Sequence, residues 1–258
     1  MMYPVLWMLG NSLNPSADML QNMSPIPAGL TMKNYVGGWE GFSGVSFGNF
    51  FFNSFVIAAA SVVGNLISCS LTAFAFARME FPMKKTLFAV MLMTIMLPYH
   101  VVLIPQYILF KYLGWINTYL PLIVPRYFAM EPFFIYLMVQ FMRGLPKELD
   151  QAATVDGCNR FQLYLRLILP LSVPALVTTT IFTFIFVWND FLSPLIYLNN
   201  VRQFTASLGL SLFISNGDGP SFYGQLFAMS VISLVPLFLI FVFFQKYLVE
   251  GIVTTGLK

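Results

Sequence analysis

Charged residues are scarce in this sequence. Only 9% of its 258 residues are Asp, Glu, Lys or Arg, against about one quarter in ordinary soluble domains. Hydrophobic residues make up 58% of the chain, and its mean hydropathy is +0.78. So few charges cannot cover the surface of a soluble protein of this length. The composition therefore predicts a polytopic membrane protein.

Cysteine and histidine are almost absent. The chain has two cysteines, Cys69 in an apolar run and Cys158 in a polar loop, and one histidine, His100. Because the cysteines are about a hundred residues apart, we expect neither a disulfide framework nor a metal site. His100 lies between Pro98 and Pro105 inside an apolar run, where a packing role and a pathway or pH-sensing role both remain open.

The motifs of nucleotide binding and of common catalysis are also missing. No Gly-x-x-x-x-Gly-Lys-Ser/Thr loop occurs, so any energy from ATP must come through another subunit. No Gly-x-Ser-x-Gly elbow and no His-Glu-x-x-His pair occurs either, and we expect no catalytic residue. This argues against an intramembrane enzyme such as a transferase or a rhomboid-like protease. The basic residues are scattered through short loops, so the net charge of +3 does not indicate a nucleic-acid partner.

Long apolar runs predict an all-α protein with five full membrane spans. The expected spans are 50–77, 86–110, 119–142, 171–198 and 223–245. Residues 14–48 and 199–222 are expected outside, and residues 143–170 are expected to form a cytosolic loop. With this topology nine basic residues lie inside and four outside, which agrees with the positive-inside rule.

Residues 1–13 are expected to form a truncated first span. Met1 to Leu9 is apolar but too short to cross a hydrocarbon core of about 30 Å. A signal peptide would need a positively charged start and a cleavage site after small residues. We therefore expect the natural protein to begin upstream of Met1.

A short polar segment lies between two of these spans. Residues Leu149-Asp-Gln-Ala-Ala-Thr-Val-Asp-Gly157 are mostly polar or small, and Leu167-Ile-Leu-Pro170 follows them. Glu148 and Asp150 suit the N-terminus of a helix, and Gly157 can take the left-handed conformation that ends one. We expect a helix of about three turns. Because it is held between two spans, its polar surface faces water and predicts contact with a soluble partner.

Four residues of the expected helix recur at a spacing that places them on one face. A second helix is expected directly after it. Asn159 begins that second helix, with Gln162 as its capping-box partner. On the first helix, the residues at i, i+3, i+4 and i+7 share a face, where small alanines would let a partner approach the backbone. These residues are Leu149, Ala152, Ala153 and Asp156.

The spacing Gln-Ala-Ala, three residues, Gly, nine residues, Leu-x-Leu-Pro closely resembles the EAA loop of ABC-importer permeases. Four further stretches resemble the maltose-type, carbohydrate-importing branch of that family, and the five together, in family order, cover most of the chain. The four are Ala75-Phe-Ala-Arg-Met-Glu-Phe-Pro82, Leu97-Pro-Tyr-His-Val-Val-Leu-Ile-Pro105, Leu113-Gly-Trp-Ile-Asn-Thr118 and Trp188-Asn-Asp-Phe-Leu192.

This resemblance implies the type I importer permease fold in a bacterial cytoplasmic (inner) membrane, surrounded by lipid. It also implies transport of a sugar or oligosaccharide, with partners that are a second permease, usually a different gene product, two ATP-binding cassette subunits and an extracytoplasmic solute-binding protein. The chain itself would need no cofactor, because its partner binds the ATP. Its coupling residues would be Leu149, Asp150, Gln151, Ala152, Ala153, Asp156 and Gly157.

Other transported solutes and another energy source remain as alternatives. A permease of the same family could carry another small solute such as glycerol phosphate. A proton-coupled secondary transporter would instead be expected to show paired inverted repeats with intramembrane charges. The two halves of this chain show no clear repeat, and the EAA-like loop would be unexplained.

Position 151 departs from the family pattern. It is Gln where the family usually has Glu, and that Glu typically pairs with a basic residue of the ATPase. Gln can still accept a hydrogen bond but lacks the charge. Either the partner lacks that base, or Asp150 or Asp156 supplies the anion.

Four residues inside the spans are candidates for the translocation path. Glu131 lies deeper in its span than Arg126, and a charge at depth is costly and usually faces a cavity or a partner. Trp188, Asn189 and Asp190 belong to a motif of the family. Asp190 could bind sugar hydroxyls and Trp188 could stack on a sugar ring, but anchoring of one helix to another remains an equal alternative.

Overall fold

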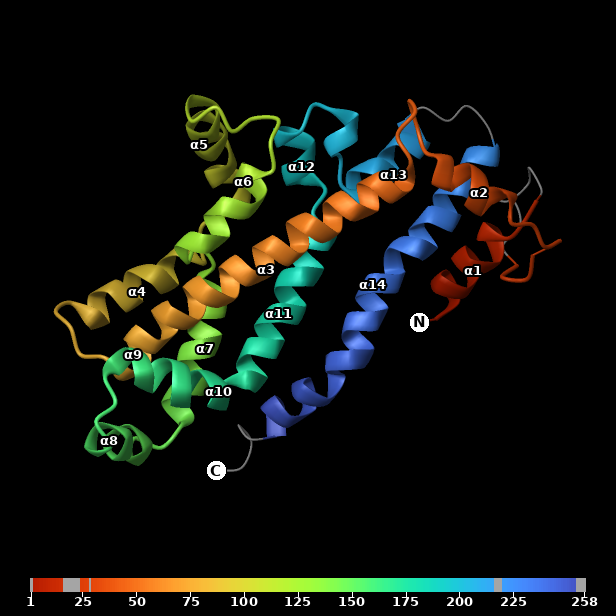
Figure 1. The fold of residues 1–258 in the computed structure, drawn as a ribbon. Helices are drawn as coiled ribbons and strands as arrows, with labels where there is room; N and C mark the ends of the chain where they lie inside the picture. Colours follow the sequence, from red (N-terminus) through yellow and green to blue (C-terminus); the bar gives the residue numbers. More distant parts are fainter. Residues whose placement is uncertain (1, 16–23, 28, 216–219, 254–258) are drawn as a thin grey trace. The chain divides into compact units, whose positions relative to one another are not determined.

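The computed structural model describes residues 2–15, 24–27, 29–215 and 220–253. Within these residues the secondary structure is helical, and the one β-type pairing is an isolated bridge between Phe42 and Val45 (Figure 1). The α-helices are α1 (Tyr3–Ser12), α2 (Lys33–Glu40), α3 (Phe47–Arg78), α4 (Lys84–Thr94), α5 (Tyr99–Tyr112), α6 (Leu120–Ile123), α7 (Pro132–Gly144), α8 (Glu148–Val155), α9 (Arg160–Leu163), α10 (Leu169–Leu171), α11 (Val173–Trp188), α12 (Leu192–Tyr197), α13 (Ala206–Ser215) and α14 (Pro220–Val253).

Three short helical segments of other types connect these helices. The 3₁₀ helix η1 (Val124–Phe128) follows α6, and η3 (Val201–Gln203) precedes α13. The segment η2 (Tyr164–Ile168) is a π-helix that joins α9 to α10. Pro170 lies just beyond η2 and has no backbone N–H to donate, so the regular α-helical hydrogen-bond pattern is interrupted there.

The chain divides into two compact units whose boundaries fall inside α3, α11 and α14. The first unit comprises Met1–Ile57 and Phe186–Val242, and the second comprises Ala58–Ile185 and Phe243–Lys258.

Aromatic packing and side-chain amides hold the first unit together. The rings of Phe42 and Phe213 lie 4.6 Å apart, edge to face. Asn53 on α3 donates to the backbone carbonyls of Arg202 and Phe204, at 2.8 and 3.0 Å. The bonded carbonyls belong to η3 and to its C-cap residue, so these amide bonds fix the segment before α13 on α3.

The core of the second unit lies between α3, α7 and the segment from α9 to α11. Phe134, Met138 and Met142 from one face of α7 are buried there together with Ile168. The hydroxyl of Tyr164 lies 2.7 Å from that of Ser70 on α3. The apolar stripe of α7 therefore packs inward, as its spacing of three and four residues requires.

The described helices can account for up to five membrane crossings. Phe47–Arg78, Leu120–Gly144 and Phe222–Lys246 are each long and apolar enough to cross a membrane. Two bent pairs could add one crossing each: α4 with α5, bent by 99°, and Arg160–Leu171 with α11, bent by 75°. Five full spans match this upper count, and the number of spans stays a prediction.

Three expected spans are not single helices. The span 119–142 is divided into α6, η1 and α7, with a break between η1 and α7. The span 86–110 breaks between α4 and α5, where Pro98 is the N-cap of α5, whereas Pro105 lies inside α5, which continues through it. Within the expected span 171–198, α11 ends at Trp188 and α12 begins at Leu192. Asp190 accepts the backbone N–H of Ser193 at 3.1 Å, and such local bonds compete with a continuing helix.

The loops also contain more structure than expected. The segment 14–48, which was expected outside, includes α2, and α3 begins within it at Phe47, which is fully buried. The side-chain amide of Asn34 on α2 donates to the carbonyls of Ser12 and Asn14, both at 3.0 Å. Parts of the expected external segments, 16–23, 28 and 216–219, lie outside the described residues, as do the first residue and the tail 254–258.

Candidate coupling helix and translocation-path residues

The polar segment forms α8, which ends where its glycine was expected to end it. Gly157 has φ +78°, and the N–H of Cys158 donates to the carbonyl of Ala153 at 2.9 Å. The N–H of Gly157 donates to Thr154 at 3.1 Å. These two bonds form a Schellman motif, so the predicted left-handed cap is confirmed. The helix has eight residues, about two turns rather than the three expected.

The second helix begins as its sequence predicts. The side chain of Asn159 accepts from the backbone N–H of Gln162 at 2.8 Å, and the side chain of Gln162 accepts from that of Asn159 at 2.9 Å. The capping box is therefore complete on both sides, and it sets the direction of α9 directly after the turn at Gly157.

The faces of α8 differ in exposure. Ala153 packs against the core of its own unit and Leu149 is half-buried, whereas Ala152 and Asp156 are exposed. Of the four residues expected on one face, two therefore lie toward the core and two lie on the exposed side of α8. Figure 1 shows α8 at an edge of its unit, beyond the ends of α7 and α9. Its outward side is available for a partner.

Two apolar side chains on the outward side were not expected. Val155, the last residue of α8, is 87% exposed, and Phe161 on α9 is also exposed. Gln151 is exposed one turn before Val155. The signal was present in the sequence as two large apolar residues inside an otherwise polar segment. The predicted contact face did not include these two residues, because it was centred on the alanines.

Asp150 is engaged within the chain. Its Oδ2 accepts from Nη1 of Arg78 at 3.1 Å, with the Asp150 side chain 22% exposed and the Arg78 side chain 3% exposed. Asp156 is exposed at the end of α8. Of the two carboxylates considered as substitutes for the charge missing at Gln151, Asp156 is the one on the surface.

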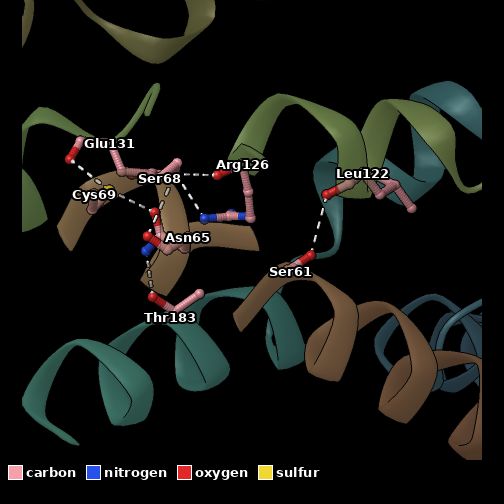
Figure 2. Close-up of polar contacts among 8 residues, drawn as sticks. All are labelled: Ser61, Asn65, Ser68, Cys69, Leu122, Arg126, Glu131 and Thr183. Atoms are coloured by element: carbon pink, nitrogen blue, oxygen red, sulfur yellow. Dashed lines mark hydrogen bonds and ion pairs between the residues drawn. The ribbon is translucent and has the colours of Figure 1, made fainter. Parts of the chain in front are cut away.

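Glu131, the N-cap residue of α7, forms an ion pair with Arg126 of η1 beside polar side chains of α3. The Arg126 Nη1 lies 2.6 Å from Oε1 of Glu131. Figure 2 shows that Ser68 on α3 donates to the carbonyl of Arg126, at 2.7 Å, and that Cys69 lies beside the backbone of Glu131. Between the two charged residues Ala129 has φ +54°. The network thus bonds carbonyls at a break between η1 and α7.

The same network extends to α11. Asn65 on α3 donates to the hydroxyl of Thr183 at 2.7 Å and accepts from the thiol of Cys69 at 3.0 Å (Figure 2). Ser61 donates to the carbonyl of Leu122 at 3.4 Å. In lipid, interhelical hydrogen bonds of this kind hold spans together where no hydrophobic drive exists between them.

Trp188 and Asp190 have structural contacts in the first unit. The indole N–H of Trp188 donates to the carbonyl of Ser233 on α14 at 3.0 Å, and its ring meets Phe51 edge to face at 5.1 Å. The Trp188 side chain is 3% exposed, so its ring is not open for stacking on a sugar. Asp190 caps the turn before α12, as described above.

A cavity of about 240 Å³ lies in the first unit next to this tryptophan. Asn189 is exposed and lines it. The structure thus brings Trp188 and Asn189 together at one cavity, while Asp190 is not among its lining residues and Glu131 belongs to the second unit. The lining residues are Met8, Trp188, Asn189, Ala206, Ser207, Leu210, Ser230, Ser233, Leu234 and Leu237.

Residues 64–254 match a family described as binding-protein-dependent transport system inner membrane component. The chain belongs to this family. It is a multi-pass subunit of the inner membrane, and the resemblance stated from its EAA-like loop is confirmed.

Curated relatives and a solved structure agree with this assignment. The permease is 32% identical to the arabinooligosaccharides transport system permease protein AraQ of Bacillus subtilis, over all of this chain and 90% of that one. It is 30% identical to the sn-glycerol-3-phosphate transport system permease protein UgpE of Brucella abortus, over 98% and 91% of the two chains.

A bacterial ABC transporter that imports the acidic polysaccharide alginate contains a chain of the same fold. The TM-score is 0.84 at 20% sequence identity, covering 96% of this chain and 90% of that one. The expected all-α importer-permease fold is therefore confirmed.

Proposed function

We propose that this permease carries a sugar or oligosaccharide across the inner membrane, and that α8 is the point where a separate ATPase subunit docks. The observation that carries the proposal is α8 itself. It is a short helix whose outward side carries polar and small residues together with the exposed Val155. It is ended by a Schellman motif at Gly157 and lies at an edge of its unit.

The docking surface would combine Gln151, Ala152, Val155 and Asp156. Ala152 lets the partner approach the backbone, and the exposed Val155 offers apolar area that docking would bury. Asp156 would accept a charge-assisted hydrogen bond from a base on the ATPase, since Asp150 is paired with Arg78. Leu149, Asp150 and Ala153 would support the helix from its inner side, and Gly157 would set its end.

The assembly would contain a second permease, two ATP-binding cassette subunits and a solute-binding protein outside the membrane. The family's description as binding-protein-dependent supports the last of these. The lack of a P-loop in the sequence supports a separate ATPase that binds the ATP. In this arrangement the chain needs no cofactor, catalyses no reaction itself and moves its spans when ATP-driven closure of the ATPases pulls on α8.

The cavity beside Trp188 supports a neutral, hydroxylated substrate. Its polar lining groups are the amide of Asn189 and the hydroxyls of Ser207, Ser230 and Ser233, which can hydrogen-bond sugar hydroxyls. None of the lining residues is basic, whereas recognition of a phosphate generally uses Arg or Lys. Asn189 would contact the substrate, Trp188 and Asp190 would hold the site in shape, and Glu131 remains a candidate for the path.

The UgpE relative supports glycerol phosphate as the second candidate. Purified transporter, isolated through a tag on this chain and reconstituted with its binding protein, distinguishes the two. We expect arabino-oligosaccharides to stimulate ATP hydrolysis and sn-glycerol 3-phosphate to leave it unchanged. Stimulation by the phosphate alone would assign the other substrate class.

Two further results would contradict the proposal more broadly. The first is purification of this chain from membranes without an ATPase subunit. The second is uptake that persists after ATP depletion but collapses when the proton gradient is dissipated, as expected of a secondary transporter.

A further inference from the structure

Arg78 connects three parts of the second unit through two contacts. It is the last residue of α3, and its side chain is 3% exposed although it is charged. Its Nη1 donates to Oδ2 of Asp150 on α8 at 3.1 Å, and its Nη2 donates to the carbonyl of Leu145 at 2.9 Å. Leu145 is the residue at which the chain leaves α7. One guanidinium thus binds the end of α7 and the start of α8 to α3.

Both contacts suit the helix ends that they join. The carbonyl of Leu145 lies at the C-terminal end of α7, where the helix dipole favours a cation. Asp150 lies in the first turn of α8, where the dipole favours an anion. A planar guanidinium can hold both partners in fixed directions, whereas the ammonium of lysine has no such preset geometry.

Burial distinguishes this pair from a nearby surface pair. Lys84 and Glu80 also lie 3.1 Å apart, but the Glu80 side chain is 92% exposed. Exposed pairs of this kind contribute little because water and salt screen them. Removing one partner of a pair that is largely withdrawn from water leaves the other without compensation. The Arg78 pair can therefore fix the position of α8, which the surface pair cannot.

The ion pair uses one nitrogen and one oxygen. Nε of Arg78 and Oδ1 of Asp150 are buried and have no hydrogen-bond partner among the described residues. The pair is therefore a single contact rather than the two parallel bonds of a bidentate pair, and the second contact of Arg78 goes to Leu145 instead. Because the two donor nitrogens of Arg78 bind different partners, Arg78 links α3 to both α7 and α8.

We propose that Arg78 is a positioning residue that makes α3 move together with α8 when the ATPase acts. This inference rests on the proposed docking of α8. A displacement of α8 by the ATPase would pass through Asp150 and Arg78 directly to the end of a 32-residue helix, instead of being absorbed in the loop between α7 and α8. Arg78 would touch neither the substrate nor the ATP.

Spin labels on the two helices test this link in the complete transporter. In a chain carrying Cys69→Ser and Cys158→Ser, labels are attached after Leu71→Cys on α3 and Lys147→Cys at the start of α8. Double electron–electron resonance then measures the distance between them without nucleotide and after trapping with ATP and orthovanadate. We expect the same distance in both states when Arg78 and Asp150 are intact.

Each of two substitutions should make the distance between the two labels differ between the nucleotide-free and the trapped state. With Arg78→Gln, or with Asp150→Asn, which keeps the side-chain shape but removes the charge and replaces one oxygen with an NH2 group, the distance should change on trapping. Lys84→Gln is the control, because it removes a basic residue whose ion-pair partner, Glu80, is 92% exposed, and it should leave the distance constant.

Either of two results would overturn the link. One is a distance that already changes in the unsubstituted chain, and the other is a distance that stays constant in both variants. Absence of ATPase subunits from the unsubstituted complex would instead contradict the proposed function, and the link with it.

Discussion

Two positions in this chain require glycine for different physical reasons. Gly157 needs its glycine for a backbone reason, since φ is +78° and an added Cβ would have no atom within 4 Å. Gly209 needs its glycine for a packing reason, since an added Cβ would lie 2.4 Å from the ring of Phe50. The first constraint can be read from sequence as a helix stop, and the second exists only in the folded chain.

Gly157→Val should weaken coupling without harming insertion in the membrane. The left-handed conformation costs a side-chain-bearing residue about 1–2 kcal/mol, so the turn should relax and redirect α8. We expect normal abundance in membranes, reduced retention of the ATPase on purification and lower uptake. Gly157→Ala should act more mildly, and Gly157→Asn more mildly still, because Asn tolerates this conformation. Gly144→Ala is the control, since that site is helical and open. Wild-type uptake by Gly157→Val would show that the cap is not required.

Gly209→Ala should destabilise the first unit by overpacking. Phe50 is fully buried, so its ring cannot move aside freely, and extra volume in a packed core typically costs about 1–3 kcal/mol. Thermal unfolding of the detergent-solubilised transporter should occur at a lower temperature. Phe50→Leu combined with Gly209→Ala should recover part of the loss, because the smaller side chain makes room. Additive losses in the double variant would contradict direct contact between the two sites.

Helix ends are where this sequence specifies its elements most clearly. The cap at Asn159 and the stop at Gly157 involve residues only a few positions apart in sequence, so they form as their patterns predict. Breaks inside spans depend on contacts with residues far away in the sequence. Segment α6 to α7 is broken at Ala129, and the carbonyls of Leu122 and Arg126 are satisfied by serines from α3. That arrangement requires two segments about sixty residues apart to meet, as the membrane demands of unpaired carbonyls.

Asn159→Ala should loosen the start of α9. Loss of an N-cap side chain typically costs about 1 kcal/mol, so backbone amides at 160–163 should exchange hydrogen for deuterium faster than in the unsubstituted chain. Mass spectrometry of the purified transporter measures this. Asn159→Asp keeps an acceptor at the cap and should exchange at nearly the original rate. Equally fast exchange in both variants would mean that the cap does not stabilise α9.

For the molecule as a whole, topology is set by the distribution of basic residues. Arg78 ends α3 and Lys84 and Lys85 begin α4, so three basic residues flank one short connection, and the positive-inside rule predicts that such a connection lies in the cytosol. The same rule places Asn199, between α12 and η3, on the opposite side. The proposed docking of an ATPase on α8 depends on this order.

Cysteine labelling tests that order of spans. In a background without Cys69 and Cys158, Lys84→Cys should react with a membrane-impermeant maleimide only after the membrane is permeabilised. Asn199→Cys should react in intact cells whose outer envelope has been opened. Labelling of position 84 from outside would reverse the assigned topology, and equal labelling of both positions would show that the cells were leaky.

The sequence by itself determined the membrane class and the end of α8, and its motifs indicated the importer-permease fold through their resemblance to a known family. The first two follow from composition and from local patterns, because lipid requires apolar runs and a left-handed turn favours glycine. The tertiary structure decided which way each side chain of that helix faces. Ala153 turns inward, Val155 turns outward, and Asp150 is paired with Arg78, 72 positions before it in the chain. Such pairings depend on how α3, α7 and α8 pack, and local sequence periodicity carries no information about that packing.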